Sequence, residues 1–149
     1  MSLEPRIRED LKKSQKALDA TRVSTLRLLL AKLTNEKIAL RKDSLTDEEE
    51  LKCIQSEIKK RKEASEMYRA GGRLESADKE NSERIILEEY MPAQASDEEL
   101  IAVINEVKNT LGVVDKSAFG KVMGQVMAKV KGRADGGRVK ALIEKVLGT

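Results

Sequence analysis

Histidine is absent from this chain of 149 residues, and the chain contains a single cysteine, Cys53. Without imidazole there is no Ser-His-Asp triad, no histidine metal ligand and no side chain that ordinarily titrates near neutrality. With one thiol, no disulfide can form within the chain, which fits a reducing compartment. These absences exclude histidine-based catalysis and histidine-ligated metal sites.

Aromatic residues and long apolar runs are also scarce. Aromatics make up 2% of the chain and proline occurs twice, whereas charged residues reach 37%. Strand-rich chains depend on aromatic and β-branched runs, so this composition favours an all-α fold. No apolar run approaches about 20 residues, so we expect no membrane-spanning segment. The N-terminal stretch MSLEPRIREDLKK lacks the apolar segment of a secretory signal, and we therefore expect a cytoplasmic protein.

Capping signals and helical spacing of apolar residues predict seven helices. They cover about residues 4–20, 22–41, 46–70, 74–90, 97–111, 117–131 and 136–147. Two capping boxes, Thr46 with Glu49 and Ser96 with Glu99, mark the clearest starts, and Ser2 is expected to cap the first helix. The stretch YMPAQA at 90–95 is typical of a linker. We therefore expect two helical subdomains, an N-terminal four-helix bundle over residues 1–91 and a C-terminal three-helix unit over residues 92–149.

The same spacing predicts which apolar residues face inward. In the first four helices these are Ile7, Leu11, Leu18, Val23, Leu26, Leu29, Leu30, Leu33, Ile38, Leu51, Ile54, Ile58 and either Met67 or Tyr68. In the last three they are Leu100, Ile101, Ile104, Val107, Phe119, Val122, Met123, Val126, Met127, Val130, Val139, Leu142, Ile143 and Val146.

The net charge of +3 is unevenly distributed. Residues 1–91 carry a net charge of +1 and residues 92–115 a net charge of −4, but residues 116–149 hold eight basic and two acidic side chains. A tail with a net charge of +6 after a nearly neutral body indicates a polyanionic partner.

Within this tail, GKVMGQVMAKVKGRADGG places Gly120, Gly124 and Ala128 on one side of a helix, apart from its broad apolar face. Glycine inside a helix costs roughly 0.5–1 kcal/mol relative to alanine. We call these three residues the close-approach strip, because their small size lets another molecule come near the backbone. Two interpretations stay open: a neighbouring helix of the same unit packs there, or a nucleic-acid backbone lies along the strip beside lysines such as Lys121 and Lys131.

The turn KGRADGG after this helix has features of a phosphate site. Its glycines leave backbone N–H groups uncovered, and the next helix offers its N-terminus. Arg133 and Arg138 supply positive charge. Asp135 opposes this interpretation, because its carboxylate caps the helix itself and repels a phosphate.

Other charged clusters have a structural interpretation that we favour over a functional one. Glu48, Glu49 and Glu50 complement the dipole of a helix start rather than bind a cation. The run 59–62, KKRK, splays around a helix, and Arg22 and Arg27 are expected to pair with carboxylates such as Glu88 or Glu89 across the bundle, with Asn35 nearby. Cys53 lies off the apolar face and is expected to be a spectator thiol.

The stretch KSAFGKVMGQVMAKVKGRADGGRVKALIEKVL resembles the C-terminal signature of the YqeY-like family and is similar to the tail of GatB, a component of the tRNA-dependent amidotransferase. STLRLLLAKLTNEKIAL, EIKKRKEASEMYRAGGR and LEEYMPAQASDEEL resemble the YqeY-like family in order, so the resemblance covers essentially the whole chain. One departure is Asp135, which stands where the amidotransferase tail tends to have asparagine.

The resemblance implies an all-helical protein of two subdomains and kinship with a module that engages tRNA during amidation of a mischarged aminoacyl-tRNA. The family label is carbon–nitrogen ligase activity with glutamine as amido-N-donor, but no catalytic residue set is visible in the sequence. We expect a noncatalytic tRNA-binding accessory module without cofactor or metal, or alternatively a helical module that docks on an amidotransferase or synthetase. The candidate tRNA-binding residues are Lys121, Lys129, Lys131, Gly132, Arg133, Arg138 and Lys140, beside the close-approach strip of Gly120, Gly124 and Ala128.

Overall fold

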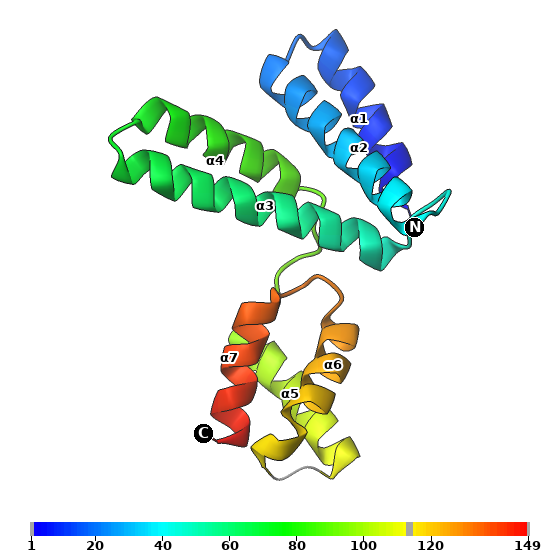
Figure 1. The fold of residues 1–149 in the computed structure, drawn as a ribbon, viewed down its shortest axis with the longest axis vertical. Helices are drawn as coiled ribbons and strands as arrows, with labels where there is room; N and C mark the ends of the chain where they lie inside the picture. Colours follow the sequence, from blue (N-terminus) through cyan, green and yellow to red (C-terminus); the bar gives the residue numbers. More distant parts are fainter. Residues whose placement is uncertain (1, 113–114, 149) are drawn as a thin grey trace. The chain divides into compact units, whose positions relative to one another are not determined.

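A computed structural model describes residues 2–112 and 115–148 of the chain. These residues form helices and turns and no strand, which confirms the predicted all-α class (Figure 1). Contacts between residues divide the chain into two compact units, residues 1–91 and residues 92–149. Each unit has its own apolar core, so each is described by itself.

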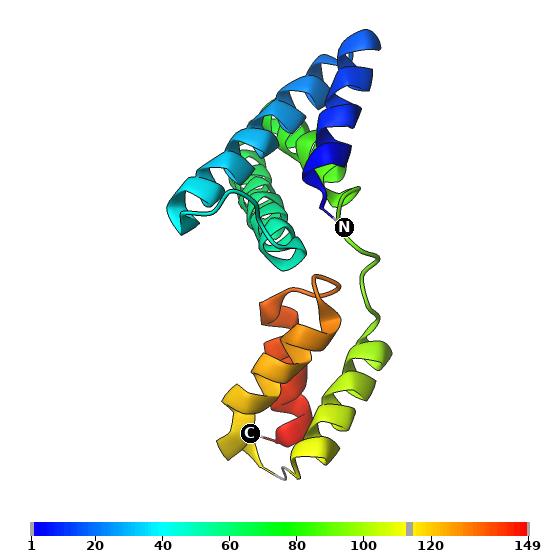
Figure 2. The ribbon, with the colours of Figure 1, turned by 90° about the vertical axis from the view of Figure 1, so that its right-hand side faces the viewer.

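The first unit consists of two helical hairpins. Helices α1 (Glu4–Lys16) and α2 (Ala20–Leu40) form one hairpin, and α3 (Asp47–Ala70) and α4 (Leu74–Glu88) form the other (Figures 1 and 2). The core lies where the two hairpins meet and holds Ile7, Leu26, Leu29, Leu33, Leu45, Ile54, Ile86, Leu87 and Tyr90. Each fully buried Leu or Ile contributes roughly 1.5–3 kcal/mol of hydrophobic stabilisation.

Local capping signals are confirmed in this unit. The Thr46 hydroxyl accepts a hydrogen bond from the Glu49 backbone N–H, and the Glu49 carboxylate accepts one from the Thr46 N–H, which completes the predicted capping box at the start of α3. Asp19 starts α2 by accepting from the Arg22 N–H. Both caps use residues three positions apart and satisfy helix N–H groups that would otherwise lack a partner.

The predicted cap of the first helix is wrong. Leu3 occupies the cap position of α1 without a side-chain cap, and the Ser2 hydroxyl instead donates to Glu50 of α3. The Glu50 carboxylate, which is 1% exposed, also accepts from the backbone N–H groups of Leu3 and Glu4, each over 3.0 Å. A buried carboxylate from another hairpin therefore takes the role that the sequence assigned to a local serine.

Two apolar residues predicted to face inward, Leu18 and Ile38, are on the surface, and of the alternatives Met67 and Tyr68 only Tyr68 is half-buried. Leu18 is 88% exposed, Ile38 69% and Met67 75%. Helix α1 ends at Lys16, four residues before the predicted end, and Leu18 lies in the turn that follows with a positive φ of 56°. Helical spacing places a residue on a face of a helix only while the helix continues, so Leu18 leaves the stripe where α1 stops.

Buried charges also join the two helices of the α3–α4 hairpin, and the buried Tyr90 links the end of this hairpin to α1. Arg61 of α3 lies 3.2 Å from the Glu57 carboxylate and 3.3 Å from that of Glu83 on α4, and all three side chains are about nine-tenths buried. The Tyr90 hydroxyl donates to Asp10 over 2.5 Å, and burial raises the pKa of this phenol well above its ordinary value. Such groups hold a fold in one arrangement, because each would be costly to bury alone.

Glu4, Glu49 and Glu89 make the stability of this unit depend on acid pH, and the hydrogen bond from Lys42 holds the pKa of Glu49 below its usual value. Lys37 and Arg8 hold the pKa of Glu4 below its usual value of 4.5, and Arg22 does the same for Glu89. A group whose pKa is lower in the folded state stabilises the fold above its unfolded pKa, and this contribution is lost as pH falls through the folded pKa.

We therefore expect the free energy of unfolding to fall as pH drops below about 4.5. The expected slope is shallower in a Glu4→Gln, Glu89→Gln double variant, measured as urea midpoints from neutral pH down to pH 3. Glu66→Gln is the matched control, because Glu66 is exposed and has no ion-pair partner among the described residues. Identical slopes for the double variant and the wild type would contradict this assignment.

The second unit contains three helices around a separate core. Helix α5 (Asp97–Leu111), a short 3₁₀ turn (Lys116–Ala118), α6 (Phe119–Val130) and α7 (Gly136–Leu147) follow in order (Figure 1). The predicted capping box of Ser96 and Glu99 is confirmed at the start of α5. The buried core residues are Ala95, Leu100, Ile104, Val107, Val122, Val126, Val130, Ala134, Val139, Ile143 and Leu147. Among the described residues, no helix combines the length and apolar composition needed to cross a bilayer.

Candidate nucleic-acid interface

The close-approach strip lies on the outer side of α6. Val122, Val126 and Val130 turn into the core of the second unit, and Gly120, Gly124 and Ala128 are exposed. A Cβ atom added at Gly120 or at Gly124 would have no neighbouring atom within 4 Å. Among the described residues of this unit no helix packs on Gly120 or Gly124, so the first of the two sequence interpretations is wrong.

Alanine at Gly120 or Gly124 is therefore expected to stabilise the chain. Both glycines have ordinary helical geometry and open space around the missing Cβ. Each Gly→Ala substitution should raise the free energy of unfolding by about 0.5–1 kcal/mol, because alanine loses less backbone entropy on forming a helix. Urea unfolding followed by circular dichroism measures the change. A loss of stability in either variant would show that the strip is covered in the folded chain.

Three of the candidate cations are paired with acids of α5. Lys129 lies 3.1 Å from the Glu106 carboxylate. Arg133 lies 2.9 Å from that of Glu99, and Arg138 lies 2.7 Å from that of Asp97. The positive tail therefore neutralises part of the negative segment before it. All three pairs are surface-exposed, where an ion pair contributes little to stability and can be exchanged for another anion.

The other three candidate cations have no such partner. Lys121, Lys131 and Lys140 are exposed, and none lies within ion-pair distance of a carboxylate among the described residues. Lys121 borders the close-approach strip on α6, Lys131 directly follows the last residue of α6, and Lys140 belongs to α7. We call Lys121, Lys131, Gly120, Gly124 and Ala128 together the α6 face.

The KGRADGG turn is engaged in contacts within its own unit. The Asp135 carboxylate accepts from the Arg138 N–H over 2.8 Å and so caps α7. Arg133 donates from Nε to the Ala93 carbonyl, and its own carbonyl accepts from the Ala95 N–H over 2.8 Å. The turn thus fastens the linker to α7, and the carboxylate of Asp135 occupies the helix N-terminus that a phosphate would use.

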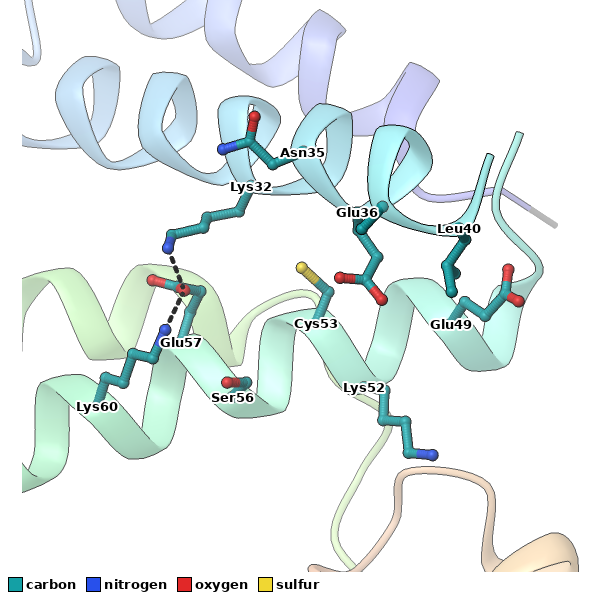
Figure 3. Close-up of a pocket in the computed structure, with 11 residues that line it drawn as sticks. Lys32, Asn35, Glu36, Leu40, Glu49, Lys52, Cys53, Ser56, Glu57 and Lys60 are labelled. Carbon is teal, nitrogen blue, oxygen red and sulfur yellow. Dashed lines mark ion pairs between the residues drawn. The ribbon is translucent and has the colours of Figure 1, made fainter. Parts of the chain in front are cut away.

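A cavity of about 600 Å³ lies between α2 and α3 in the first unit (Figure 3). The sequence did not predict it, because its walls come from two helices separated in the chain. Glu57 at its edge is already neutralised by Lys32 and Lys60, at 3.7 and 3.5 Å. Cys53 also lines the cavity, and burial raises the pKa of its thiol, so the thiolate needed for nucleophilic attack is disfavoured.

The remaining charged clusters have structural roles. Arg22 makes two hydrogen bonds to Glu89, over 2.8 and 3.0 Å, as the sequence predicted, but Arg27 is exposed and has no ion pair among the described residues. The run 59–62 splays around α3, with Arg61 largely buried and the three lysines exposed. The described residues contain no group of three His, Cys, Asp or Glu side chains placed to hold a metal ion. The roles of Glu50 and Glu83 could not be read from the sequence, because their partners lie far away in the chain.

Comparison with known proteins gives one family and several relatives. A family model described as "Yqey-like protein" matches residues 4–147. "Altered inheritance of mitochondria protein 41, mitochondrial" of Pyrenophora tritici-repentis is 30% identical, over 97% of this chain and 80% of the relative. The protein with the same name in Eremothecium gossypii is 35% identical, over 80% and 67%. An uncharacterized protein of Schizosaccharomyces pombe is 34% identical, over 64% and 76%.

Proposed function

This chain belongs to the YqeY-like protein family, and we propose that it acts there as a noncatalytic module that binds tRNA through the α6 face. One observation carries the proposal. The α6 face combines an exposed stretch of helix backbone with two lysines that no carboxylate neutralises among the described residues.

The exposed glycines matter because they remove side-chain bulk. A sugar–phosphate backbone lying along Gly120 and Gly124 approaches the helix more closely than it could over larger residues. Lys121 and Lys131 then flank it, and each lysine that meets a phosphate releases condensed counterions. Phosphate contacts of this kind position an RNA without reading its sequence, as expected of an accessory module.

The paired cations contribute in a second way. Lys129, Arg133 and Arg138 already hold acids of α5, so they cannot contact RNA without giving up those pairs. We assign the primary phosphate contacts to Lys121, Lys131 and Lys140. The three paired cations contribute less to the electrostatic attraction of RNA. We propose a cytoplasmic location, while two relatives carry the word mitochondrial in their names.

A triple variant tests this assignment. Lys121→Gln, Lys131→Gln and Lys140→Gln together remove three unpaired cations and keep their aliphatic stems. We expect tRNA affinity at low salt to fall about tenfold or more, because each lost phosphate contact removes a counterion-release contribution. Fluorescence anisotropy with labelled tRNA measures the change.

The matched control removes the same charge elsewhere. Lys59, Lys62 and Lys79 lie on the α3–α4 hairpin, are exposed and have no ion-pair partner among the described residues. Their triple glutamine variant should keep most of the wild-type affinity. Equal losses in both triple variants would show attraction by net charge alone, and the α6 face would then have no special role.

The exposed strip also fits a second function, docking on a protein. A helix of an amidotransferase or synthetase packing on Gly120 and Gly124 would use the same open backbone. Binding of purified amidotransferase to the immobilised chain after nuclease treatment separates the two functions. Retention of the partner after nuclease, and its loss in a Gly124→Leu variant, would favour protein docking.

A further inference from the structure

Positive charge is also concentrated in the α1–α2 hairpin of the first unit. Residues 4–41 carry ten basic and five acidic side chains, and residues 42–91 carry ten basic and fourteen acidic ones. The hairpin thus has a net charge of +5 and the remainder of the unit a net charge of −4. The near-neutral total of residues 1–91 hides this separation.

Two acids of the hairpin are used inside the fold. Glu4 binds Lys37, with 2.5 Å between Nζ and Oε2, and also Arg8. Asp10 accepts the hydroxyl of Tyr90.

Of the other acids of the hairpin, Asp19 pairs with Arg22. Glu9, which is exposed one turn before Lys12 and Lys13, and Glu36 have no ion-pair partner among the described residues. The hairpin therefore keeps a surplus of positive charge rather than a surface without acids.

Five cations of residues 4–41 stay exposed and lie within ion-pair distance of no carboxylate among the described residues; Arg41 caps the far end of α2, and the other four lie nearer the α1–α2 turn. We call these four the hairpin patch: Lys12, Lys13, Lys16 and Arg27. Part of the role of Lys13 and Lys16 is to complement the C-terminal end of the α1 dipole. That role needs neither Lys12 nor Arg27.

The register of the hairpin places Lys12 of α1 and Arg27 of α2 at a similar level along the two helices. Helices α1 and α2 run antiparallel side by side (Figures 1 and 2), and the pair of Glu4 with Lys37 fixes their alignment. With about 1.5 Å of rise per residue in each helix, Lys12 lies at about the level of Arg27. Lys16 follows Lys12 by one turn on the same face of α1.

We propose that the hairpin patch is a second contact surface for the phosphate backbone of RNA. This inference rests on the proposed function, and it concerns residues 12–27, which lie outside the C-terminal stretch that resembles the amidotransferase tail.

A membrane surface is the other polyanion to consider. Membrane-bound helices bury a whole apolar face in the lipid, but Ile7 is fully buried in the protein core and Leu11 packs against that core. Near the patch, Leu18 is 88% exposed and Leu28, beside Arg27, is 52% exposed, but these two residues belong to different elements and do not form an apolar helix face.

The test uses the intact chain with Lys12→Gln, Lys16→Gln and Arg27→Gln. We expect tRNA to bind about tenfold more weakly, and the slope of log affinity against log salt to lose about two units. The Lys59, Lys62, Lys79 triple glutamine variant has the same net charge and should change neither quantity appreciably. Acetylation of the wild type with and without tRNA gives a readout without mutation: bound tRNA should protect Lys12, Lys13 and Lys16.

The outcomes separate this inference from the proposed function. If the Lys121, Lys131, Lys140 triple variant weakens binding but the hairpin variant behaves like its control, this inference fails and the proposed function stands. If the wild type binds no tRNA at low salt, both fail. Hairpin lysines that acetylate equally with and without tRNA would also overturn the inference. So would a variant that keeps full tRNA affinity but loses binding to phosphatidylserine vesicles, because the patch would then serve a membrane.

Discussion

Replacing Arg61 with methionine is expected to lower the free energy of unfolding by about 3 kcal/mol or more, because it leaves a buried carboxylate without its partner. Glu83 is 7% exposed, and Arg61 is its ion-pair partner among the described residues, at 3.3 Å. The loss of Arg61 is less costly for Glu57, because Lys32 and Lys60 still neutralise the Glu57 carboxylate. Urea unfolding followed by circular dichroism measures the loss.

Two further variants identify the cause. Lys60→Met removes the same charge from an exposed position and should cost less than about 0.5 kcal/mol. Adding Glu83→Gln to Arg61→Met should restore part of the lost stability, because the unpaired charge is gone. If Arg61→Met cost less than about 1 kcal/mol, or if Glu83→Gln gave no recovery, the network would not join α3 to α4 as described.

Glu50→Ala is expected to have the second large effect, a loss of about 3 kcal/mol. Its carboxylate accepts two backbone N–H groups and the Ser2 hydroxyl at the start of α1. Hydrogen bonds to charged groups contribute about 1.5–3 kcal/mol each, and their loss leaves donors unsatisfied at a partly buried site. The change should appear in urea unfolding and as faster amide exchange at the N-terminal end of α1.

The matched control for this prediction is Glu48→Ala. Glu48 lies in the same first turn of α3 but is exposed, so only its interaction with the helix dipole is lost, a few tenths of a kcal/mol. Glu50→Gln keeps the shape and an acceptor oxygen and should fall between the two. A Glu50→Ala variant as stable as Glu48→Ala would show that α1 does not depend on this carboxylate.

Features that depend on neighbouring residues could be predicted from the sequence. The capping boxes at Thr46 and Ser96 and the Asp135 cap involve residues three positions apart, and the structure contains all of them. The apolar face of α6 was equally predictable, because helical spacing defines it while the helix continues. Such local signals were sufficient to predict the helices and the all-α class.

Features that depend on distant partners could not be predicted. Glu50 meets the start of α1 across 46 to 48 positions of sequence, so a local serine looked like the better cap. The tail cations looked uniformly available, yet three of them bind α5 acids 23 to 41 positions earlier. Exposed Ile38 and Met67 have the same hydrophobicity as buried residues, and only the hairpin packing distinguishes them.

Because acids of α5 neutralise three of the tail cations, the candidate interface lies elsewhere than the sequence indicated. A net charge of +6 over residues 116–149 indicated a continuous basic surface. In the folded unit the arginines of the turn are paired with acids, and the lysines beside the glycines of α6 are not paired among the described residues. The candidate site therefore moves from the KGRADGG turn to the outer side of the helix before it.

The salt dependence of tRNA binding by the intact wild-type chain tests the proposed function most directly. Three phosphate contacts from the second unit predict that log affinity falls with log salt at a slope of about −2 or steeper, and a contribution from the hairpin patch makes it steeper still. Measurable binding at low salt with that slope is the expected result. Absence of binding at low salt, or an affinity that salt leaves unchanged, would contradict an RNA-binding role for this chain.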